Sequence, residues 1–235
     1  MTRRRWIADE VSGNRAILTG DHAEHLARVL RARVGQEFDI ATGLAVRKSR
    51  ITSIAERRVE FELGEEVPAA TAAKITLALA VFKFDRMEWA IEKCTELGVA
   101  HIVPVIAQRT DVHLAAATIK RTERWRRIAR QAAEQSRRAL PPEIAAPVEL
   151  PEALRLPGDV RIVLAEENTL LRDVLEPLPQ EAEIVLAVGP EGGWTIDEFV
   201  SFHQAGWTSA SLGKTVLRAE TAAIAATAIA TSELS

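Results

Sequence analysis

The sequence contains little of several residues on which small proteins often depend. It has one cysteine, Cys94, two methionines and no tyrosine, and aromatic residues make up 5% of its 235 positions. A single cysteine excludes an internal disulfide and argues against a cysteine-based metal site. We therefore interpret Cys94 as a small apolar residue that is buried in the core.

Long apolar runs are also absent. No segment approaches the length of a membrane span, and the N-terminal residues 1–7 include three arginines but lack the apolar stretch of a signal peptide. We therefore expect a cytoplasmic protein that does not enter a membrane. The hydrophobic content of 47% indicates a globular chain, and its length allows one large domain or two modest ones.

Common nucleotide and metal motifs are missing as well. The turn Gly213-Lys214-Thr215 resembles the end of a P-loop, but that motif requires glycine where Thr208 stands. The glycine turn at 189–193 does not match the dinucleotide fingerprint Gly-x-Gly-x-x-Gly. The five histidines show no spacing that completes a metal-ligand set. We expect no nucleoside triphosphatase, no dinucleotide fold and no metal.

Charge is distributed unevenly along the chain, although the formal net charge is only -3. Residues 83–142 contain 12 Lys and Arg against 7 Asp and Glu, whereas residues 143–235 contain 5 against 15. Eight of the basic residues fall on a helix expected over about 119–138. A charged, solvated helix face is the usual meaning of such a pattern, but this excess favours contact with nucleic-acid phosphates.

Residues 1–70 are expected to form a small β-rich domain. Alternating patterns predict strands over 37–41, 50–54 and 58–63. A helix that Asp21 could cap interrupts them, with its apolar positions between 23 and 30. A small, partly closed barrel would accommodate these elements. Small residues at 68–73 then mark the domain boundary.

Residues 71–235 alternate between predicted strands and helices, which indicates an α/β domain. The pattern predicts a helix over 86–97 that Gly98 ends, and an alanine-rich final helix over about 220–232 that should be buried. The predicted strands cover 74–82, 102–106, 160–165 and 184–188.

The most informative stretch is 184–199. Ile184–Val188 is a continuous apolar run typical of a strand buried on both faces, and Gly189-Pro190 ends it. Gly192 and Gly193 free the backbone, and Thr195 with Glu198 predicts a capped helix. Such turns after strands are where open α/β sheets bind ligands. From this stretch alone, a turn that serves only connectivity is an equally good interpretation.

Three segments together resemble the ribosomal RNA small subunit methyltransferase E family. They are Lys83-x-x-Arg-Met-Glu-x-x-x-x-Lys-x-Thr-Glu-Leu-Gly-Val99, Val188-Gly-Pro-Glu-Gly-Gly-Trp194 and Leu212-Gly-x-x-Val-Leu-Arg-Ala-Glu-Thr-Ala222. The segments 25–31 and 132–137, with Pro141 and Pro142, fit the same family. The matches span both expected domains.

The resemblance implies an α/β fold in which a small PUA-like β-barrel domain over 1–70 binds RNA. A SPOUT-type domain with a trefoil knot follows over 71–235 and binds S-adenosylmethionine. The resemblance further implies a homodimer that methylates N3 of a uridine in 16S rRNA within the small ribosomal subunit. Two other functions stay open: a knotted methyltransferase that acts on tRNA, and a non-catalytic RNA-binding assembly protein.

The resemblance also assigns residues to sites. Arg218 is the first catalytic candidate, as a cation beside the uracil anion, and Glu220 is a tentative general base or a helix cap. The expected cofactor-binding residues are Leu164, Ala165, Glu166, Gly189, Pro190, Glu191, Gly192, Gly193, Leu212, Gly213, Val216, Leu217 and Arg218. The expected RNA-binding residues are Arg4, Arg5, His25, Arg28, Arg31, Lys83, Arg86, Arg109, Arg127, Arg130, Gln135, Arg137 and Arg138.

The sequence departs from the family pattern at two places. Residues 42–46 lack the aromatic residue that we expect in the barrel, and Arg109-Thr110 stands where the family has Arg-Ser. Both departures concern the contacts with RNA rather than the cofactor site.

Overall fold

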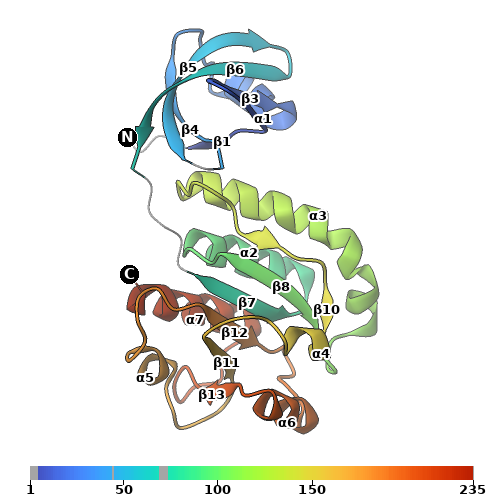
Figure 1. Cartoon of the computed structure of the whole chain (residues 1–235). Coiled ribbons are helices and arrows are strands. Elements are labelled where there is room, and N and C mark those ends of the chain that lie inside the picture. The colour runs from blue at the N-terminus through green and yellow to red at the C-terminus, as the bar shows by residue number, and fades with distance from the viewer. Residues whose placement is uncertain (1–4, 44, 69–73, 235) are drawn as a thin grey trace. The chain divides into compact units, whose positions relative to one another are not determined.

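A computed structural model describes residues 5–43, 45–68 and 74–234 (Figure 1). The chain divides into two compact units. The first comprises residues 1–71 together with 133–141, and the second comprises 72–132 and 142–235. The sequence-based boundary between residues 70 and 71 lies outside the described residues. The predicted division into residues 1–70 and 71–235 also differs from the structure at residues 133–141, which pack with the first unit.

The first unit is built on one six-stranded sheet with the order β1-β4-β5-β6-β3-β2. The strand predicted over 37–41 is confirmed, and those predicted over 50–54 and 58–63 lie within longer strands. The sequence patterns missed the three short strands before residue 20. The bounds are β1 Trp6–Ile7, β2 Glu10–Ser12, β3 Arg15–Thr19, β4 Glu37–Ala41, β5 Val46–Ala55 and β6 Arg58–Val67.

This sheet curls until its two edges meet. β1 and β2 stand at opposite ends of the strand order, although two residues separate them in the chain. Of those two residues, Ala8 donates its N–H to the carbonyl of Ala41 at 2.9 Å, and Asp9 donates to Ile17 at 2.9 Å. Consecutive Cα atoms lie about 3.8 Å apart, so β4 and β3 must approach each other around the sheet. The enclosed side chains, including Trp6 and Phe61, form one hydrophobic core.

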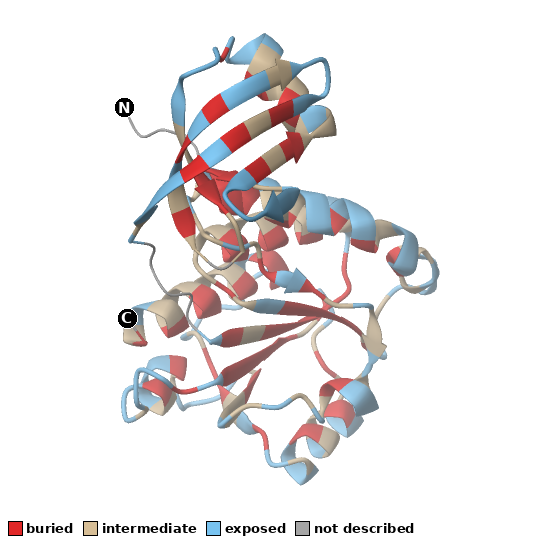
Figure 2. Ribbon diagram, turned by 45° about the horizontal axis from the view of Figure 1, so that its top comes forward, coloured by how far each residue is buried: buried red, intermediate tan, exposed pale blue. Residues whose placement is uncertain are grey.

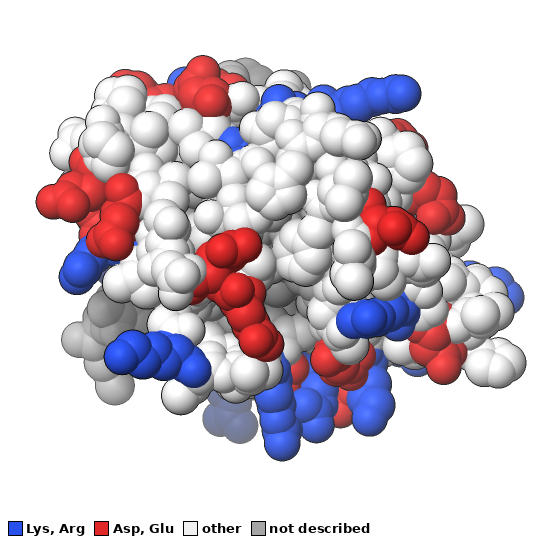
Figure 3. Space-filling model, turned by 90° about the horizontal axis from the view of Figure 1, so that it is seen from below, with Lys and Arg blue, Asp and Glu red and all other residues white. Residues whose placement is uncertain are grey.

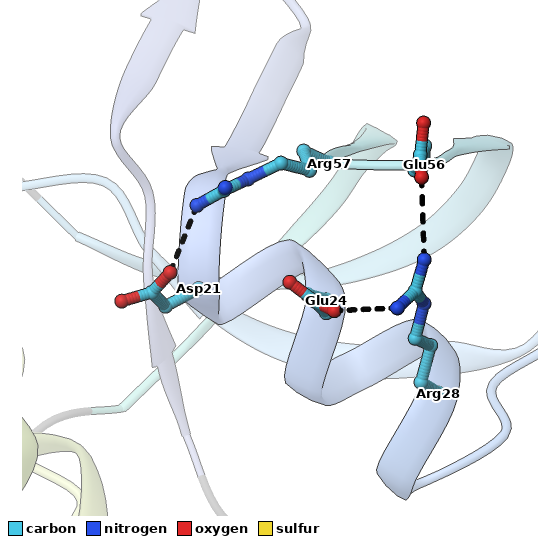
Figure 4. Close-up of polar contacts among 5 residues, drawn as sticks. All are labelled: Asp21, Glu24, Arg28, Glu56 and Arg57. Carbon is cyan, nitrogen blue, oxygen red and sulfur yellow. Dashed lines mark hydrogen bonds and ion pairs between the residues drawn. The ribbon is translucent and has the colours of Figure 1, made fainter.

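A short helix packs on this curled sheet. α1 (Gly20–Glu24) continues into a π-helical turn, η1 (His25–Val29), and Ala23 and Leu26 are buried. The prediction that Asp21 caps this helix is wrong. Thr19 is the N-cap residue, and Asp21 lies in the first turn. The Asp21 carboxylate accepts from Arg57 at 2.9 Å, because the Arg57 side chain reaches it from the neighbouring β-turn (Figure 4).

The second unit is a parallel sheet with the order β10-β8-β7-β12-β11-β13, and β9 pairs with β8. The strand predicted over 184–188 is confirmed with the same bounds, and the other predicted strands are confirmed within two residues at each end. The bounds are β7 Ile75–Ala80, β8 His101–Ile106, β9 Glu143–Ile144, β10 Val148–Glu149, β11 Val160–Leu164, β12 Ile184–Val188 and β13 Thr208–Ala210.

Six helices accompany this sheet within residues 74–234. Their bounds are α2 Phe84–Glu96, α3 Val112–Gln135, α4 Leu150–Ala153, α5 Leu171–Leu175, α6 Ile196–Gln204 and α7 Ala219–Glu233. The basic helix α3 begins at Val112 rather than near residue 119. Asp111 explains the difference, because its carboxylate accepts from the N–H groups of His113 at 2.8 Å and Leu114 at 3.3 Å. No helix in the described part of the chain is long and apolar enough to cross a membrane.

Helices cover both faces of the sheet, and residues alternate between the two cores along each strand. In β12, Ile184 and Leu186 pack into one core with side chains from α2, α3, α5 and α7. Val185 and Ala187 pack into the other, with Phe202 of α6 and Ala153 of α4. Figure 2 shows the resulting buried residues along the central strands. All five residues of β12 are therefore buried, as the apolar run predicted.

Cys94 lies on the buried face of α2 and is fully buried, as predicted. Burial raises the pKa of its thiol to about 12, although a hydrogen bond from Thr227 partly opposes this effect. The thiolate is the reactive form, so we expect no reaction of the native protein with iodoacetamide at pH 8. Mass spectrometry should detect one adduct only after unfolding in urea. Rapid labelling of the native chain would contradict the buried position of Cys94.

Candidate functional site

A cavity of about 670 Å³ lies at the carboxyl ends of the strands in the second unit. Its walls come mainly from the loops after β11, β12 and β13. The sequence-predicted cofactor residues that line it are Leu164, Ala165, Glu166, Gly189, Pro190, Glu191, Gly192, Gly193, Leu212, Gly213, Val216 and Leu217. The cofactor-binding residues that the resemblance implies, apart from Arg218, therefore come from three loops that meet around one space.

Backbone hydrogen bonds join two of these loops directly. Ala165 donates to the carbonyl of Ala210 at 2.9 Å, which extends the pairing of β11 with β13. Beyond the strand ends, Ser211 donates to Thr169 at 2.8 Å and accepts from Leu171 at 2.8 Å. The loops after β11 and β13 are thus held side by side, and together they form one wall of the cavity.

The central loop, residues 189–195, ends in the capping box that the sequence predicts. The Glu198 N–H donates to the Thr195 hydroxyl at 3.3 Å, and the Thr195 N–H donates to the Glu198 carboxylate at 2.7 Å. These bonds satisfy backbone donors at the start of α6. This pair of hydrogen bonds fixes the residue at which the loop that lines the cavity ends and α6 begins.

The three glycines of the central loop serve different purposes. A Cβ on Gly189 would lie 3.2 Å from the indole nitrogen of Trp194, and one on Gly192 would lie 3.2 Å from Cδ of Arg109. These two glycines make room for the protein's own side chains, a reason that the sequence analysis did not identify. Gly193 has φ +69°, and a Cβ there would meet nothing within 4 Å. Of the three, only Gly193 leaves open space where a side chain would be.

Trp194 lines the cavity and also belongs to the hydrophobic core, although the sequence analysis did not single it out. Its side chain is 5% exposed, and its ring centroid lies 5.0 Å from that of Phe202. An aromatic residue directly after two glycines, before a capped helix, was the available signal. The other lining residues that the sequence analysis missed are Glu167, Val188, Ile196, Phe199, Val200, His203, Thr215, Ala219 and Ala222.

Acidic side chains outnumber basic ones around the cavity. Glu166, Glu167 and Glu191 contribute to its lining, whereas Arg109 is the one Lys or Arg among the lining residues that the structure describes. Figure 3 shows the face of the second unit that carries α5, β13 and α6, where acidic and uncharged side chains occupy the centre. Such a lining favours a ligand that carries positive charge.

The two catalytic candidates lie in different surroundings. Arg218 is exposed at the N-cap position of α7, between the lining residues Leu217 and Ala219, but does not itself line the cavity. Glu220 is 4% exposed, and its carboxylate pairs with Arg86 at 2.9 Å. Its second oxygen is buried without a hydrogen-bond partner among the described residues. Glu220 does not line the cavity either.

Some of the RNA-binding candidates belong to the first unit. Arg4 lies outside the described residues. Arg5 is buried, its guanidinium donates to the carbonyl of Arg137, and burial lowers its pKa below the usual value while Asp39 partly opposes this shift. Arg28 is paired with Glu24 at 2.7 Å and with Glu56 at 3.3 Å (Figure 4).

Five further candidates in this unit are at least partly accessible. His25 is half-buried beside Trp6, with ring centroids 5.8 Å apart, and Arg31 is exposed. Gln135 and Arg137 are exposed after the basic stretch of α3. Arg138 is half-buried, and burial lowers the pKa of its guanidinium to about 10, so it stays charged at neutral pH.

The remaining RNA-binding candidates belong to the second unit. Lys83 and Arg127 are exposed, and Arg130 is half-buried on α3. Arg86 pairs with Glu220, and Arg109 lies in the cavity wall rather than on a separate surface. Among residues 5–43, 45–68 and 74–234, no group of three His, Cys, Asp or Glu side chains could hold a metal ion.

Comparison with known proteins identifies the family. A family model described as an RNA methyltransferase domain matches residues 69–231. Proteins named ribosomal RNA small subunit methyltransferase E are similar over most of the chain. The protein from Synechocystis sp. is 34% identical over 87% of this chain and 69% of its own length. The one from Mycobacterium tuberculosis is 33% identical over 92% of this chain and 85% of its own length.

Solved structures agree with these sequence matches. A ribosomal RNA small subunit methyltransferase E from Neisseria gonorrhoeae, bound to S-adenosyl methionine, has a TM-score of 0.85 at 31% identity and covers 97% of this chain and 96% of its own. A methyltransferase from Legionella pneumophila, also in complex with that cofactor, has a TM-score of 0.86 at 28% identity, over 99% and 98% of the two chains. With the RNA methyltransferase domain and relatives above 30% identity, this chain belongs to the ribosomal RNA small subunit methyltransferase E family.

Proposed function

We propose that this chain methylates N3 of one uridine in the 16S rRNA of the small ribosomal subunit. The methyl donor is S-adenosylmethionine, and we assign it to the cavity between the loops after β11, β12 and β13. The convergence of these three loops, in a chain of this family, is the observation that carries the proposal. The second unit would then be a SPOUT domain with a trefoil knot, and the first a PUA-like RNA-binding barrel.

The cavity has the volume and chemistry that this cofactor requires. Its volume of about 670 Å³ lies within the usual range of ligand sites. Gly193 and Gly213 both have positive φ and open space where a Cβ would be, so a ligand can approach the backbone closely. The carboxylates at 166, 167 and 191 complement the sulfonium and ammonium charges, and apolar residues such as Leu164 and Val188 suit the adenine ring.

When bound, S-adenosylmethionine supplies a methyl group on a sulfonium, which a nucleobase nitrogen can take by in-line attack. The protein has to orient the two reactants, keep water out and favour loss of the imide proton from the uracil. A cation beside the base would stabilise the uracil anion. Arg218 suits this role, because it is exposed next to the cavity and has no ion-pair partner among the described residues.

Glu220 suits a supporting role better than that of a general base. A base must come within hydrogen-bond reach of the proton that it removes. Glu220 is buried, does not line the cavity, and holds Arg86 of α2 at 2.9 Å. We propose that this ion pair fixes the first turn of α7, and with it the adjacent Arg218.

RNA contact is supported by the basic excess on α3 and by the exposed arginines at 31, 127 and 137. A homodimer is supported by apolar side chains that are exposed at the rim of the cavity. Ile196 is 82% exposed and Val216 is 81% exposed, and both residues line the cavity. A second copy of the chain would bury them.

Arg218→Ala should lower the turnover number for methyl transfer by about 100-fold, because it removes the cation beside the developing uracil anion. Affinity for S-adenosylmethionine should stay within about twofold, since Arg218 does not line the cavity. Titration calorimetry measures the affinity, and transfer of a labelled methyl group to small ribosomal subunits measures turnover. Lys214→Ala, which removes an exposed charge from the same loop, is the matched control. Unchanged turnover in Arg218→Ala would remove this residue from the mechanism.

Gly193→Val should abolish cofactor binding, because the new side chain enters the open space of the cavity and the positive φ of +69° strains a β-branched residue. Gly13→Val serves as the control, since Gly13 also has a positive φ of +56° and open space but lies in the turn between β2 and β3. Both variants share the backbone strain. Calorimetry should detect cofactor binding to the Gly13 variant alone, and equal affinity of the two folded variants would refute the assignment of the cavity.

The substrate is tested by offering small ribosomal subunits and tRNA in parallel and mapping the modified base. We expect methyl transfer to 16S rRNA at uridine N3 alone. Transfer to tRNA instead would favour the related tRNA enzyme. A melting temperature that S-adenosylmethionine does not raise would favour a non-catalytic RNA-binding protein, because a ligand of the folded state must stabilise it.

A further inference from the structure

The loop after β8, residues 107–111, contacts the cofactor cavity although it is not one of the three loops assigned to it. Arg109 from this loop lines the cavity. In the sheet order, β7 separates β8 from β12, so the central loop 189–195 must extend past the end of β7 to meet it. The contacts between these two loops involve two charged side chains.

Glu198 links the two loops through both oxygens of its carboxylate. One oxygen accepts from the Thr195 N–H at 2.7 Å, which completes the capping box of α6. The other accepts from the Gln108 N–H, also at 2.7 Å, in the loop after β8. The side chain is 5% exposed. A capping box needs only the first of these bonds, so the second bond has a separate purpose.

Arg109 links the loops in the opposite direction. Its guanidinium donates to the carbonyl of Gly192, and to the carbonyl of Trp194 at 3.4 Å. The aliphatic part of Arg109 lies against Gly192, where a Cβ would come within 3.2 Å of Cδ. Gly192 therefore allows this arginine to reach the backbone of the central loop.

The loop after β8 is itself fixed to the sheet. The Thr110 hydroxyl accepts from the Ala107 N–H at 3.1 Å and donates to the carbonyl of Val81 at 3.2 Å, directly after β7. The Val81 N–H donates to Val105 of β8 at 2.8 Å. Residues 107–110 thus form a support that is anchored independently of the cavity.

We propose that Glu198 and Arg109 are positioning residues for the cofactor, which hold the central loop against the loop after β8 in the conformation that binds S-adenosylmethionine. This inference rests on the cofactor assignment proposed above. Glu198 is buried, and breaking a bond to a buried charged group leaves its partner unsatisfied. Without the links, the central loop would sample other conformations. The affinity for the cofactor would then fall in proportion to the fraction of molecules whose loop is still in the binding conformation.

Glu198→Gln tests the carboxylate with almost no change in shape. The amide keeps one acceptor oxygen but turns an NH₂ group toward one of the two backbone N–H donors, so one link is lost. Asp197→Asn is the matched control, because it removes the same charge from the same helical turn at an exposed side chain. We expect Glu198→Gln to bind S-adenosylmethionine about tenfold more weakly or worse, and Asp197→Asn to bind it as the unaltered chain does.

Kinetics separate positioning from general loss of structure. In Glu198→Gln, the KM for S-adenosylmethionine should rise with the dissociation constant, while turnover at saturating cofactor stays within about threefold of the unaltered chain. A partly unfolded population would instead lower turnover at every cofactor concentration. Equal cofactor affinity of Glu198→Gln and Asp197→Asn, with the unaltered chain binding normally, would overturn the inference.

Arg109 gives a second, independent test, because its exposed side chain can be truncated without opening the core. Arg109→Ala and Arg109→Lys should both bind S-adenosylmethionine more weakly in calorimetry without RNA, since lysine cannot present two donors in a fixed fork. If Arg109 only contacts RNA, the cofactor affinity of both variants will be unchanged, and that result overturns its assignment. Failure of the unaltered chain to bind the cofactor would refute the proposed function itself.

Discussion

Parallel pairing of the strands in the second unit is the constraint on which the cavity depends. β8, β7, β12, β11 and β13 all run in one direction, so the loops that follow them leave the sheet at the same edge. Helices bury both faces of the sheet, and at this edge the backbone and polar groups of the loops can meet a ligand. The lining of the cavity therefore comes mainly from short segments between strand ends and helix starts.

Acidic and basic residues gather in different parts of the chain. The acidic residues of the C-terminal third gather partly around the cavity, where a cationic donor of methyl groups would lie. Most of the basic excess lies on α3 and just after it, where several arginines are already occupied. Arg124 and Arg126 hold Glu88 and Glu123, and Arg126 also donates to the carbonyl of Ile144. Exposed basic residues on this helix and just after it would supply the proposed contacts with RNA phosphates.

Local signals predicted the centre of the site well. The apolar run 184–188 and the pair Thr195 and Glu198 depend on neighbouring residues only, and the structure reproduces both. Contacts between distant segments could not be predicted in this way. The residues around Glu198 do not predict its bond to Gln108, which lies ninety positions away. Likewise, position 192 needs a glycine because the side chain of Arg109 packs against it. The same limit explains why residues 133–141 were not assigned to the first unit. The start of α3 at Val112 is a different case, because it depends on a local cap, Asp111, that lies outside the basic pattern from which the helix was predicted.

Trp194 makes one wall of the cavity stiffer than the opposite wall. Its indole is stacked edge-on against Phe202, which meets Trp207 in the same manner, so one wall of the cavity is also the surface of the core. Exposing a buried tryptophan costs about 4–6 kcal/mol at ~25 cal/mol per Å². The Trp194 end of the central loop is therefore held to the core, whereas residues 189–193 before it depend on other contacts, such as that of Arg109 with Gly192. The turn at residues 213–216 on the other side of the cavity is exposed at every position. The wall that carries Trp194 is therefore the stiffer of the two, and the opposite turn would gain its support from the second copy that covers Val216.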